Sequence, residues 1–302
     1  MFFSVIICTF RRAESLRQTL QTVVNQSFKS SDFEIIVADN NSRDATAAVV
    51  QHFVDNYPRH SIKYCLETRQ GGSFARNAGA KLAAGEILIF FDDDVLVAEN
   101  YLQSAADFFL KNTDVGAVGG KIVPKYLPHG VPPDWMHSLM ESLAGKFDIG
   151  NHVTILDKKF PFEGNVAYRR ADFEAVGGFD AAIAGVIDEK RVSGEGKDLI
   201  FRVRKSGKKI AYHPEMQVFH CVNSDELSAR FDNITTGIGR GEFARLKKSQ
   251  NPTLFIFIKK LEYLAKLWFV RVIGIFLPKL QATQLVRFRK NVLLGFGEDI
   301  AK

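Results

Sequence analysis

The sequence predicts an α/β protein whose mainly parallel central sheet is flanked by helices. Apolar runs, each followed by polar residues, alternate with segments of helical spacing from the first residues to Lys111. An unbroken apolar run is typical of a strand buried on both faces, as in a parallel sheet. Alternating strands and helices form right-handed βαβ units. The polar residues at the strand ends are therefore expected to gather along one edge of the sheet.

The first part of the chain supplies four of these units. Strands are predicted at residues 3–8, 33–38, 61–66 and 87–91. Each strand is followed by a predicted helix. The first begins at Ala13, the second begins near Asp44, which may cap it, the third begins at 71–73, and the fourth covers 101–111.

The second part is predicted from shorter segments. It contains strands at 115–123, 160–170, 209–212 and 217–220, helices at 171–176 and after 193–199, and a loop at 124–135 that is rich in Pro and Gly. With 302 residues, the chain is long enough for a large core and two lobes.

Charge is spread unevenly along the chain. The net charge is +6, and residues 240–302 carry 13 Lys and Arg against 4 Asp and Glu, a balance of +9 that leaves −3 for the rest. The basic excess thus belongs to the C-terminal tail, and no nucleic-acid partner is expected. Three scattered cysteines, Cys8, Cys65 and Cys221, favour free thiols in a reducing, cytoplasmic setting. The N-terminus reads as a first strand and not as a signal peptide.

An acidic triplet follows the most apolar strand. Residues 87–91 run directly into Asp92, Asp93 and Asp94. Ligands of open α/β sheets bind outside the carboxyl ends of strands. Adjacent carboxylates repel one another unless a cation or hydrogen-bond donors neutralise them. The triplet therefore predicts a site for Mg2+ or Mn2+, which prefer oxygen ligands and bridge to phosphates; a solvated acidic turn is the alternative.

Two other strand ends suggest nucleotide recognition. Asp39 could accept an N–H of a base, Asn41 and Ser42 could bond a ribose, and Arg76 could meet phosphate or base. The alternatives are an Asx turn at Asp39 and a surface salt bridge at Arg76. The sequence has neither a Walker A motif nor a G-x-G-x-x-G fingerprint, which excludes a P-loop enzyme and a standard dinucleotide binder.

Together these segments resemble the family-2 glycosyltransferases over about residues 3–222. The resemblance rests on five motifs in order, and these are Cys8-Thr9-Phe10-Arg11-Arg12, Val37-Ala38-Asp39-Asn40-Asn41-Ser42, Ala75-Arg76-Asn77-Ala78-Gly79, Asp92-Asp93-Asp94 and Gly164-Asn165-Val166-Ala167-Tyr168-Arg169-Arg170.

The resemblance implies the GT-A fold, here with a C-terminal helical extension. It implies transfer of a sugar, with inversion, from a nucleotide-diphosphate sugar (a UDP-sugar is favoured) to a saccharide or lipid-linked acceptor in polysaccharide or glycoconjugate biosynthesis, with Mn2+ or Mg2+ as cofactor. Residues 1–122 would form the nucleotide-sugar half, 123–222 the acceptor half, and 223–302 an amphipathic helical region.

The resemblance also implies roles for individual residues. Nucleotide-sugar binding falls to Thr9, Phe10, Arg11, Asp39, Asn41, Arg76, Asp92, Asp93, Gly164 and Asn165, the last two beside the donor sugar. Metal binding falls to Asp94 first, with Asp92 and His220; a His in a β-turn is the alternative for His220.

One motif departs from the family pattern. The family usually carries Gly-Glu-Asp-x-Asp-Leu, whereas Gly194-Glu195-Gly196-Lys197-Asp198-Leu199 stands here. Glu195 is the predicted general base. Asp198 is the reserve, and could instead bond an acceptor hydroxyl or cap the following helix.

Two other classes of protein remain open. A nucleotidyltransferase also uses a parallel sheet and carboxylate-held metal, but needs a glycine-rich loop after the first strand, and residues 9–12 contain no glycine. A binding module that holds nucleotide sugar without turnover is favoured by the missing Asp at Gly196.

The C-terminal region predicts two amphipathic helices. Residues 253–277 are apolar but are interrupted by Lys259, Lys260, Glu262, Lys266 and Arg271, so no stretch of about 20 apolar residues exists to span a bilayer. Pro278 ends this helix, and a second covers 280–294. A basic amphipathic helix with Trp and Phe favours a peripheral position on the inner face of the plasma membrane. The alternative is a helical cap on the core or a dimer contact.

Overall fold

The computed structural model describes residues 2–183, 185–187 and 190–296. They form two compact units. The first contains residues 2–124, 145–180 and 196–221, and the second contains residues 125–144, 181–183, 185–187, 190–195 and 222–296. The functional division at residues 122 and 222 stays a prediction.

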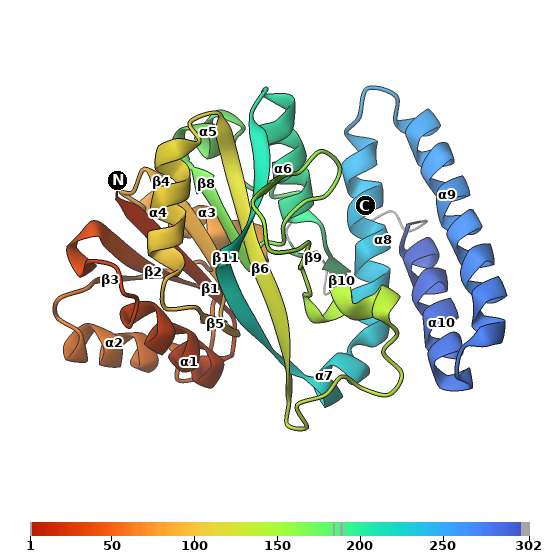
Figure 1. Ribbon diagram of the computed structural model, residues 1–302, viewed down its shortest axis with the longest axis horizontal. Coiled ribbons are helices and arrows are strands. Elements are labelled where there is room, and N and C mark those ends of the chain that lie inside the picture. The colour runs from red at the N-terminus through yellow and green to blue at the C-terminus, as the bar shows by residue number, and fades with distance from the viewer. Residues whose placement is uncertain (1, 184, 188–189, 297–302) are drawn as a thin grey trace. The chain divides into compact units, whose positions relative to one another are not determined.

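The first unit is built on a sheet whose N-terminal part is parallel (Figure 1). Its strands are β1 (Phe3–Thr9), β2 (Phe33–Asp39), β3 (Ser61–Leu66) and β4 (Ile87–Asp92), in the order β3-β2-β1-β4. Phe3 pairs with Phe33 on one side and with Ile87 on the other. The carboxyl ends of β1, β2 and β4 therefore lie next to one another, as expected.

The rest of the sheet is mixed. Its strands are β5 (Val95–Val97), β6 (Val115–Leu127), β7 (Thr154–Ile155), β8 (Asn165–Arg169) and β11 (Lys209–Asn223). Strand β8 runs antiparallel between β4 and β6, and β11 pairs antiparallel with β5 and β7. The sheet as a whole is mixed and flanked by helices, so the predicted α/β class is confirmed.

Three predicted boundaries are wrong. Strand β6 continues to Leu127, into the predicted loop, and β8 begins only at Asn165. The two strands predicted at 209–212 and 217–220 are one strand, β11. Strand β11 continues through Pro214, which cannot donate to a ladder and lies at a partly exposed point of the strand.

Helices cover the sheet through apolar stripes. They are α1 (Ala13–Val24), α2 (Thr46–Asn56), α3 (Gly72–Leu82), α4 (Tyr101–Lys111), α5 (Arg170–Ala175) and α6 (Glu195–Lys205), with a short 3-10 turn, η1 (Ser30–Asp32). Helix α1, for example, buries Leu16, Leu20 and Val23, which share one face. Helix α3 approaches β1 closely at Gly79, where an added Cβ would lie 2.6 Å from Ile6 Cγ2.

The second unit is mainly helical. It contains the hairpin β9 (Gly185–Ile187) and β10 (Lys190–Val192), helices α7 (Ser224–Ala229), α8 (Phe231–Lys247), α9 (Pro252–Ile273) and α10 (Lys279–Gly295), and two 3-10 turns, η2 (Ser138–Ala144) and η3 (Gly274–Phe276). Helix α8 meets α10 where Gly239 and Gly295 allow backbone contact. The predicted helical extension is therefore confirmed.

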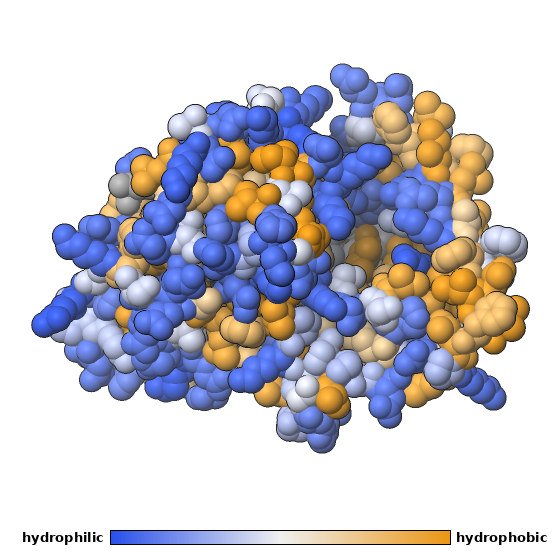
Figure 2. Space-filling model, in the orientation of Figure 1, coloured by the Kyte–Doolittle hydropathy of each residue, from blue (hydrophilic) through white to orange (hydrophobic). Residues whose placement is uncertain are grey.

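Helix α9 packs through a narrow stripe and leaves much apolar surface exposed. Tyr263, Leu267 and Val270 are buried, whereas Phe257, Trp268 and other large apolar side chains are exposed. Figure 2 shows hydrophobic side chains gathered over the C-terminal helices. None of the helices in the described ranges is long and apolar enough to cross a membrane.

Candidate active site

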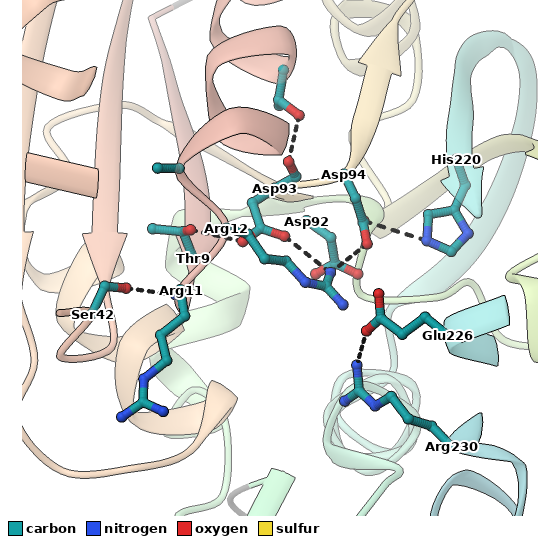
Figure 3. A network of polar contacts seen from close by, with 12 residues as sticks. Thr9, Arg11, Arg12, Ser42, Asp92, Asp93, Asp94, His220, Glu226 and Arg230 are labelled. Atoms are coloured by element: carbon teal, nitrogen blue, oxygen red, sulfur yellow. Dashed lines mark hydrogen bonds and ion pairs between the residues drawn. The ribbon is translucent and has the colours of Figure 1, made fainter. Parts of the chain in front are cut away.

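The acidic triplet lies at the end of β4, beside the ends of β1 and β2 (Figure 3). Cys8 pairs with Asp92 and Thr9 with Asp39 in the sheet register. A polar group from each of three neighbouring strands thus reaches the same edge. Strand β11 supplies a fourth, because His220 pairs with Val95, the residue that follows the triplet.

Asp93 is the most buried member of the triplet. Thr9 Oγ1 donates a hydrogen bond of 2.7 Å to its Oδ2, and Arg12 Nη1 lies 3.3 Å from its Oδ1. Thr19 Oγ1 donates to its carbonyl oxygen at 2.9 Å. Burial, with the neighbouring Asp94 charge, raises the pKa of Asp93. Asp93 is therefore held inward by β1 and α1.

Asp94 faces β11. Arg12 Nη1 donates to its Oδ2 at 2.5 Å, and the Cys221 N–H donates to its carbonyl oxygen at 2.8 Å. His220 Nε2 lies 3.3 Å from its Oδ1, an ion-pair distance at which the geometry falls short of a good hydrogen bond. Burial alone would raise the pKa of Asp94, but His220 and Arg12 outweigh it and lower that pKa. Asp94 is thus the ionised member of the buried pair.

Asp92 is the most exposed of the three carboxylates, with 40% of its side chain accessible. Arg76 Nη2, from α3, donates to its Oδ1 at 2.9 Å. Gly164 packs on its other side, where an added Cβ would lie 2.6 Å from Asp92 Oδ2. Glycine at this position lets the chain pass directly beside the carboxylate. Arg76 is largely buried, so this ion pair is not the surface salt bridge considered as an alternative.

The arginine that reaches the triplet is Arg12, for which the sequence analysis predicted no role; its neighbour Arg11 was predicted to bind the nucleotide, and this stays a prediction. Arg11 has a left-handed backbone with φ of 55°, and its N–H donates to Ser42 Oγ at 2.8 Å. Its guanidinium lies 4.8 Å from the centre of the Phe10 ring, and both side chains are exposed. The sequence signals for Arg12 were its place in the motif Cys8-Thr9-Phe10-Arg11-Arg12 and its position directly before α1.

Asp39 is buried and already engaged. Its Oδ1 accepts from the Ser42 N–H at 2.9 Å and its Oδ2 from Tyr64 Oη at 2.6 Å. Asn41 follows with a left-handed φ of 65°. The neighbouring Asn40, which was not predicted, bonds the segment before α3 through Arg69 O and Gly71 N. The Asx-turn alternative for Asp39 is therefore present in the structure.

Asn165 is fully buried, and its side chain is used inside the protein. Tyr101 Oη donates to its Oδ1 at 2.8 Å, and its Nδ2 donates to Lys121 O at 3.1 Å and Met216 O at 2.9 Å. These bonds tie β8 to β6, β11 and α4. The predicted contact of this side chain with the donor sugar is corrected to a positioning role.

The start of α6 gathers several acidic side chains. Glu195 Oε2 accepts from the Gly194 N–H at 2.9 Å, and Asp198 Oδ2 pairs with Arg202 Nε at 2.7 Å. The Gly196 N–H donates to Glu163 Oε1 at 2.5 Å. Glu163 was not predicted; its sequence signal was an acidic residue directly before Gly164.

His220 lies within β11, so the β-turn considered for it is wrong. In the described part of the chain, no group of three or more His, Cys, Asp and Glu side chains converges as a ready metal site. In this structure Arg12 and Arg76 supply the positive charge beside the triplet.

Comparison with known proteins bears on this site. The sequence matches Glycosyl transferase family 2 over residues 4–177. It is 26% identical over 223 residues to the glucosyl-dolichyl phosphate glucuronosyltransferase of Haloferax volcanii, covering 73% of this chain and 69% of that one. It is 29% identical over 280 residues to the validoxylamine A glucosyltransferase of Streptomyces hygroscopicus subsp. jinggangensis, covering 83% of this chain and 62% of that one.

Solved structures share the fold at low identity. A mannosyltransferase from Pyrobaculum calidifontis, in complex with GDP-Man and Mn2+, superposes with a TM-score of 0.68 at 17% identity and covers 97% of this chain and 86% of its own. S. aureus TarS in complex with UDP-GlcNAc gives 0.54 at 16% identity and covers 98% and 89%. The family match spans more than half of the sequence, and the chain belongs to glycosyl transferase family 2.

Proposed function

We propose that this glycosyltransferase moves a hexosyl group from a nucleotide-diphosphate sugar to an acceptor hydroxyl with inversion at the anomeric carbon. The observation that carries the proposal is the acidic triplet at the end of β4, next to the polar ends of β1 and β2. Two solved structures with a similar fold are complexes with GDP-Man and UDP-GlcNAc, which supports a nucleotide-sugar donor. A UDP-sugar is the donor we favour.

The nucleotide would bind across the ends of β1, β2 and α3. Phe10 offers an exposed ring and Arg11 an exposed guanidinium beside it, suited to a base and to phosphate. A carboxylate has about four acceptor positions, so Asp39 can accept a base N–H in addition to Ser42 and Tyr64. The other proposed donor contacts are Thr9, Asn41, Arg76, Asp92, Asp93 and Gly164.

The triplet fits a divalent cation by its chemistry. Asp94 Oδ1 is buried without a hydrogen-bond partner among the described residues, and it faces the imidazole of His220. Carboxylate oxygen and imidazole nitrogen both suit Mn2+, and carboxylate oxygen suits Mg2+. Asp94, Asp92 and His220 would hold the ion, and the Mn2+ complex of the mannosyltransferase supports this choice. When bound, the ion would neutralise charge on the departing diphosphate.

The reaction is a single displacement. The acceptor oxygen attacks the anomeric carbon and loses its proton to a base, while the bond from that carbon to the diphosphate oxygen breaks and its electron pair leaves with the nucleotide. The transition state is oxocarbenium-like. Glu195 is the base proposed from the sequence. Asp198, oriented by Arg202 at 2.7 Å, is proposed to bond an acceptor hydroxyl.

Incubation with a panel of nucleotide-diphosphate sugars, Mn2+ and candidate acceptors tests the function. The proposal expects nucleoside diphosphate to be released in step with glycosylated product of inverted configuration. Release of pyrophosphate from nucleoside triphosphates would instead indicate a nucleotidyltransferase. Tight binding of donor with no turnover for any acceptor would indicate a binding module.

The C-terminal helices support a lipid-linked acceptor at an anionic membrane surface. Exposed Phe257, Trp268 and Phe269 on α9 lie among exposed Lys260 and Arg271. A groove between the end of α9 and α10 is lined by Arg271, Arg287 and Lys290 with the apolar Ile275. Apolar side chains with basic neighbours bind headgroup interfaces of anionic lipid. The proposed location is therefore cytoplasmic and peripheral, on the inner face of the plasma membrane.

Liposome sedimentation tests this surface. We expect binding to vesicles with anionic lipid to weaken as salt rises and to fall strongly in the Trp268→Ser, Phe269→Ser variant, whose two side chains are exposed and leave the buried stripe of α9 intact. Equal binding by this variant, or equal binding to neutral vesicles, would contradict the proposal.

A further inference from the structure

Position 196 is where the family pattern carries an aspartate and this chain carries glycine. The space that a side chain would enter there is filled. A Cβ added to Gly196 would lie 2.3 Å from both Cγ and Oε1 of Glu163 and 2.4 Å from its Cδ. A side chain at position 196 would therefore displace the Glu163 side chain from its present place. The Glu163 carboxylate stands at the place where a side chain on residue 196 would begin.

We infer that Glu163 is the general base of this enzyme and supplies the carboxylate that position 196 lacks. The inference rests on the proposed function and names the catalytic residue of that same site. The Glu163 carboxylate would take the proton of the acceptor hydroxyl as the acceptor oxygen bonds the anomeric carbon. The bond to the diphosphate breaks in the same step, and its electron pair leaves with the nucleotide.

The place of Glu163 in the chain, directly before the glycine that packs on Asp92, carries this inference. Glu163 directly precedes Gly164, whose α-carbon packs against Asp92 so closely that an added Cβ would meet the Asp92 Oδ2 at 2.6 Å. A turn in which the Asn165 N–H donates to Phe162 O at 3.1 Å fixes the intervening residues. The buried Asn165 side chain anchors the same segment. Glu163 is thus held one residue from the chain that touches the proposed donor site, within the same unit.

The start of α6 favours the ionised form that a base needs. The Gly196 N–H donates to Glu163 Oε1 at 2.5 Å. A backbone N–H at the first turn of a helix, together with the helix dipole, stabilises a carboxylate over its neutral acid. The same contact fixes the direction in which the carboxylate points.

The two acidic side chains predicted from the sequence, Asp198 and Glu195, make other contacts. Asp198 is largely buried and paired with Arg202 at 2.7 Å. Glu195 turns back on its own backbone, where its Oε2 accepts from the Gly194 N–H at 2.9 Å. A purely structural role for Glu163, capping α6, is the alternative that the experiment must separate from catalysis.

The first test is Glu163→Gln, with Glu174→Gln, an exposed carboxylate on α5 in the same unit, as the matched control. Glutamine keeps the size and the oxygen that accepts from the Gly196 N–H, so it preserves the cap but cannot accept a proton. We expect turnover at saturating donor to fall at least about 100-fold while donor affinity stays close to that of the wild type. Glu174→Gln should keep its turnover. Normal turnover by Glu163→Gln would show that Glu163 only caps α6, and it would overturn the inference.

The second test exchanges the two positions. Glu163→Gly removes the carboxylate, and Gly196→Asp alone places a side chain within 2.3 Å of the Glu163 side chain, so both single variants should be poor enzymes. The double variant Glu163→Gly, Gly196→Asp removes the collision and restores a carboxylate at the same place. We expect it to turn over at least about tenfold faster than either single variant. A folded double variant no faster than the single variants rejects the equivalence of the two positions.

The wild-type protein, assayed in parallel, separates this inference from the proposed function. If the wild type transfers no sugar from any donor, the proposed function fails. If the wild type transfers sugar and Glu195→Gln is inactive while Glu163→Gln is not, only the assignment of the base fails.

Discussion

The parallel strands of the first unit carry buried carboxylates at both ends, and the two ends are neutralised in different ways. At the amino end, Glu34 of β2 pairs in register with Ser4 and Ser61. Its Oε1 accepts from Ser4 Oγ and from the Ala84 N–H, both at 2.6 Å, and Lys63 Nζ lies 2.5 Å from its Oε2. Burial alone would raise the pKa of Glu34, but these three partners lower it.

At the carboxyl end, three carboxylates share two guanidinium groups. Arg12 serves Asp93 and Asp94, and Arg76 serves Asp92. Asp93 has a raised pKa, and Asp94 Oδ1 lacks a hydrogen-bond partner among the described residues. One end is therefore complete within the protein, and the other retains negative charge for a ligand to neutralise. The difference separates a carboxylate that stabilises the fold from carboxylates that serve a reaction.

The largest expected effect comes from the carboxyl end. Asp94→Asn removes the ionised member of the buried pair, and a lost metal contact worth about 4 kcal/mol in the transition state corresponds to a fall in turnover of about 1,000-fold. Because the variant also removes like-charge repulsion, thermal unfolding should change little. Steady-state assays with saturating Mn2+, together with calorimetry, check both expectations. A variant that keeps its turnover would show that the triplet does not serve the reaction.

The opposite pattern is expected at the amino end. Glu34→Gln keeps the shape but loses charged hydrogen bonds with Ser4, Lys63 and the Ala84 N–H, at a cost of about 2 kcal/mol in the free energy of unfolding. Turnover of the folded protein should stay close to that of the wild type. Denaturant titration at neutral pH measures the loss, and the same preparations are assayed for transfer.

The difference in stability between the wild type and Glu34→Gln should depend on pH. The pKa of Glu34 is lowered in the folded state, so its stabilising contribution is present above its ordinary value of 4.5 and is lost as pH falls through the folded value. The stability gap between wild type and Glu34→Gln should therefore narrow on acidification below about pH 4.5. A gap that is constant from neutral to acid pH would mean that the charge of Glu34 contributes nothing.

A smaller effect distinguishes the cations at the two ends. Arg12→Ala should lower the unfolding free energy by about 1 kcal/mol without metal, because Arg12 is partly exposed and its ion pairs are screened by solvent. Mn2+ should recover this loss, because the cation takes over the neutralisation. Lys63→Ala, at the amino end of the strands, is the matched control, and its unfolding free energy should not respond to Mn2+. Equal responses of the two variants in a thermal melt would erase the proposed difference between the ends.

The sequence was sufficient for the parallel part of the fold. Apolar runs followed by Thr9, Asp39 and Asp92 predicted both the strands and the edge at which these residues meet, because parallel order brings carboxyl ends together. Contacts between residues that are far apart in the sequence could not be predicted from it. Glu163 lies 33 residues from Gly196, and only the folded arrangement brings its carboxylate to the start of α6.

Neighbouring residues of one type were a second limit. A sequence pattern does not distinguish Arg11 from its neighbour Arg12. In the structure Arg11 has a left-handed φ of 55°, and it is Arg12 that binds the triplet. Asn165 was assigned to the sugar through its resemblance to a family motif that begins at Gly164. Full burial among β6, β8 and β11 gives its amide internal partners, which no local pattern reveals.

Binding of nucleoside diphosphates tests the central claim, that the carboxyl end is completed by a cation that arrives with the donor. The measurement is the thermal midpoint of the wild type and Asp94→Asn with UDP or GDP, each in Mn2+ and in excess chelator. Because a ligand that binds the native state raises the midpoint, the account predicts a rise for the wild type with at least one nucleotide in Mn2+. It predicts little rise in chelator or for Asp94→Asn. An equal rise in chelator, or in Asp94→Asn, would contradict it.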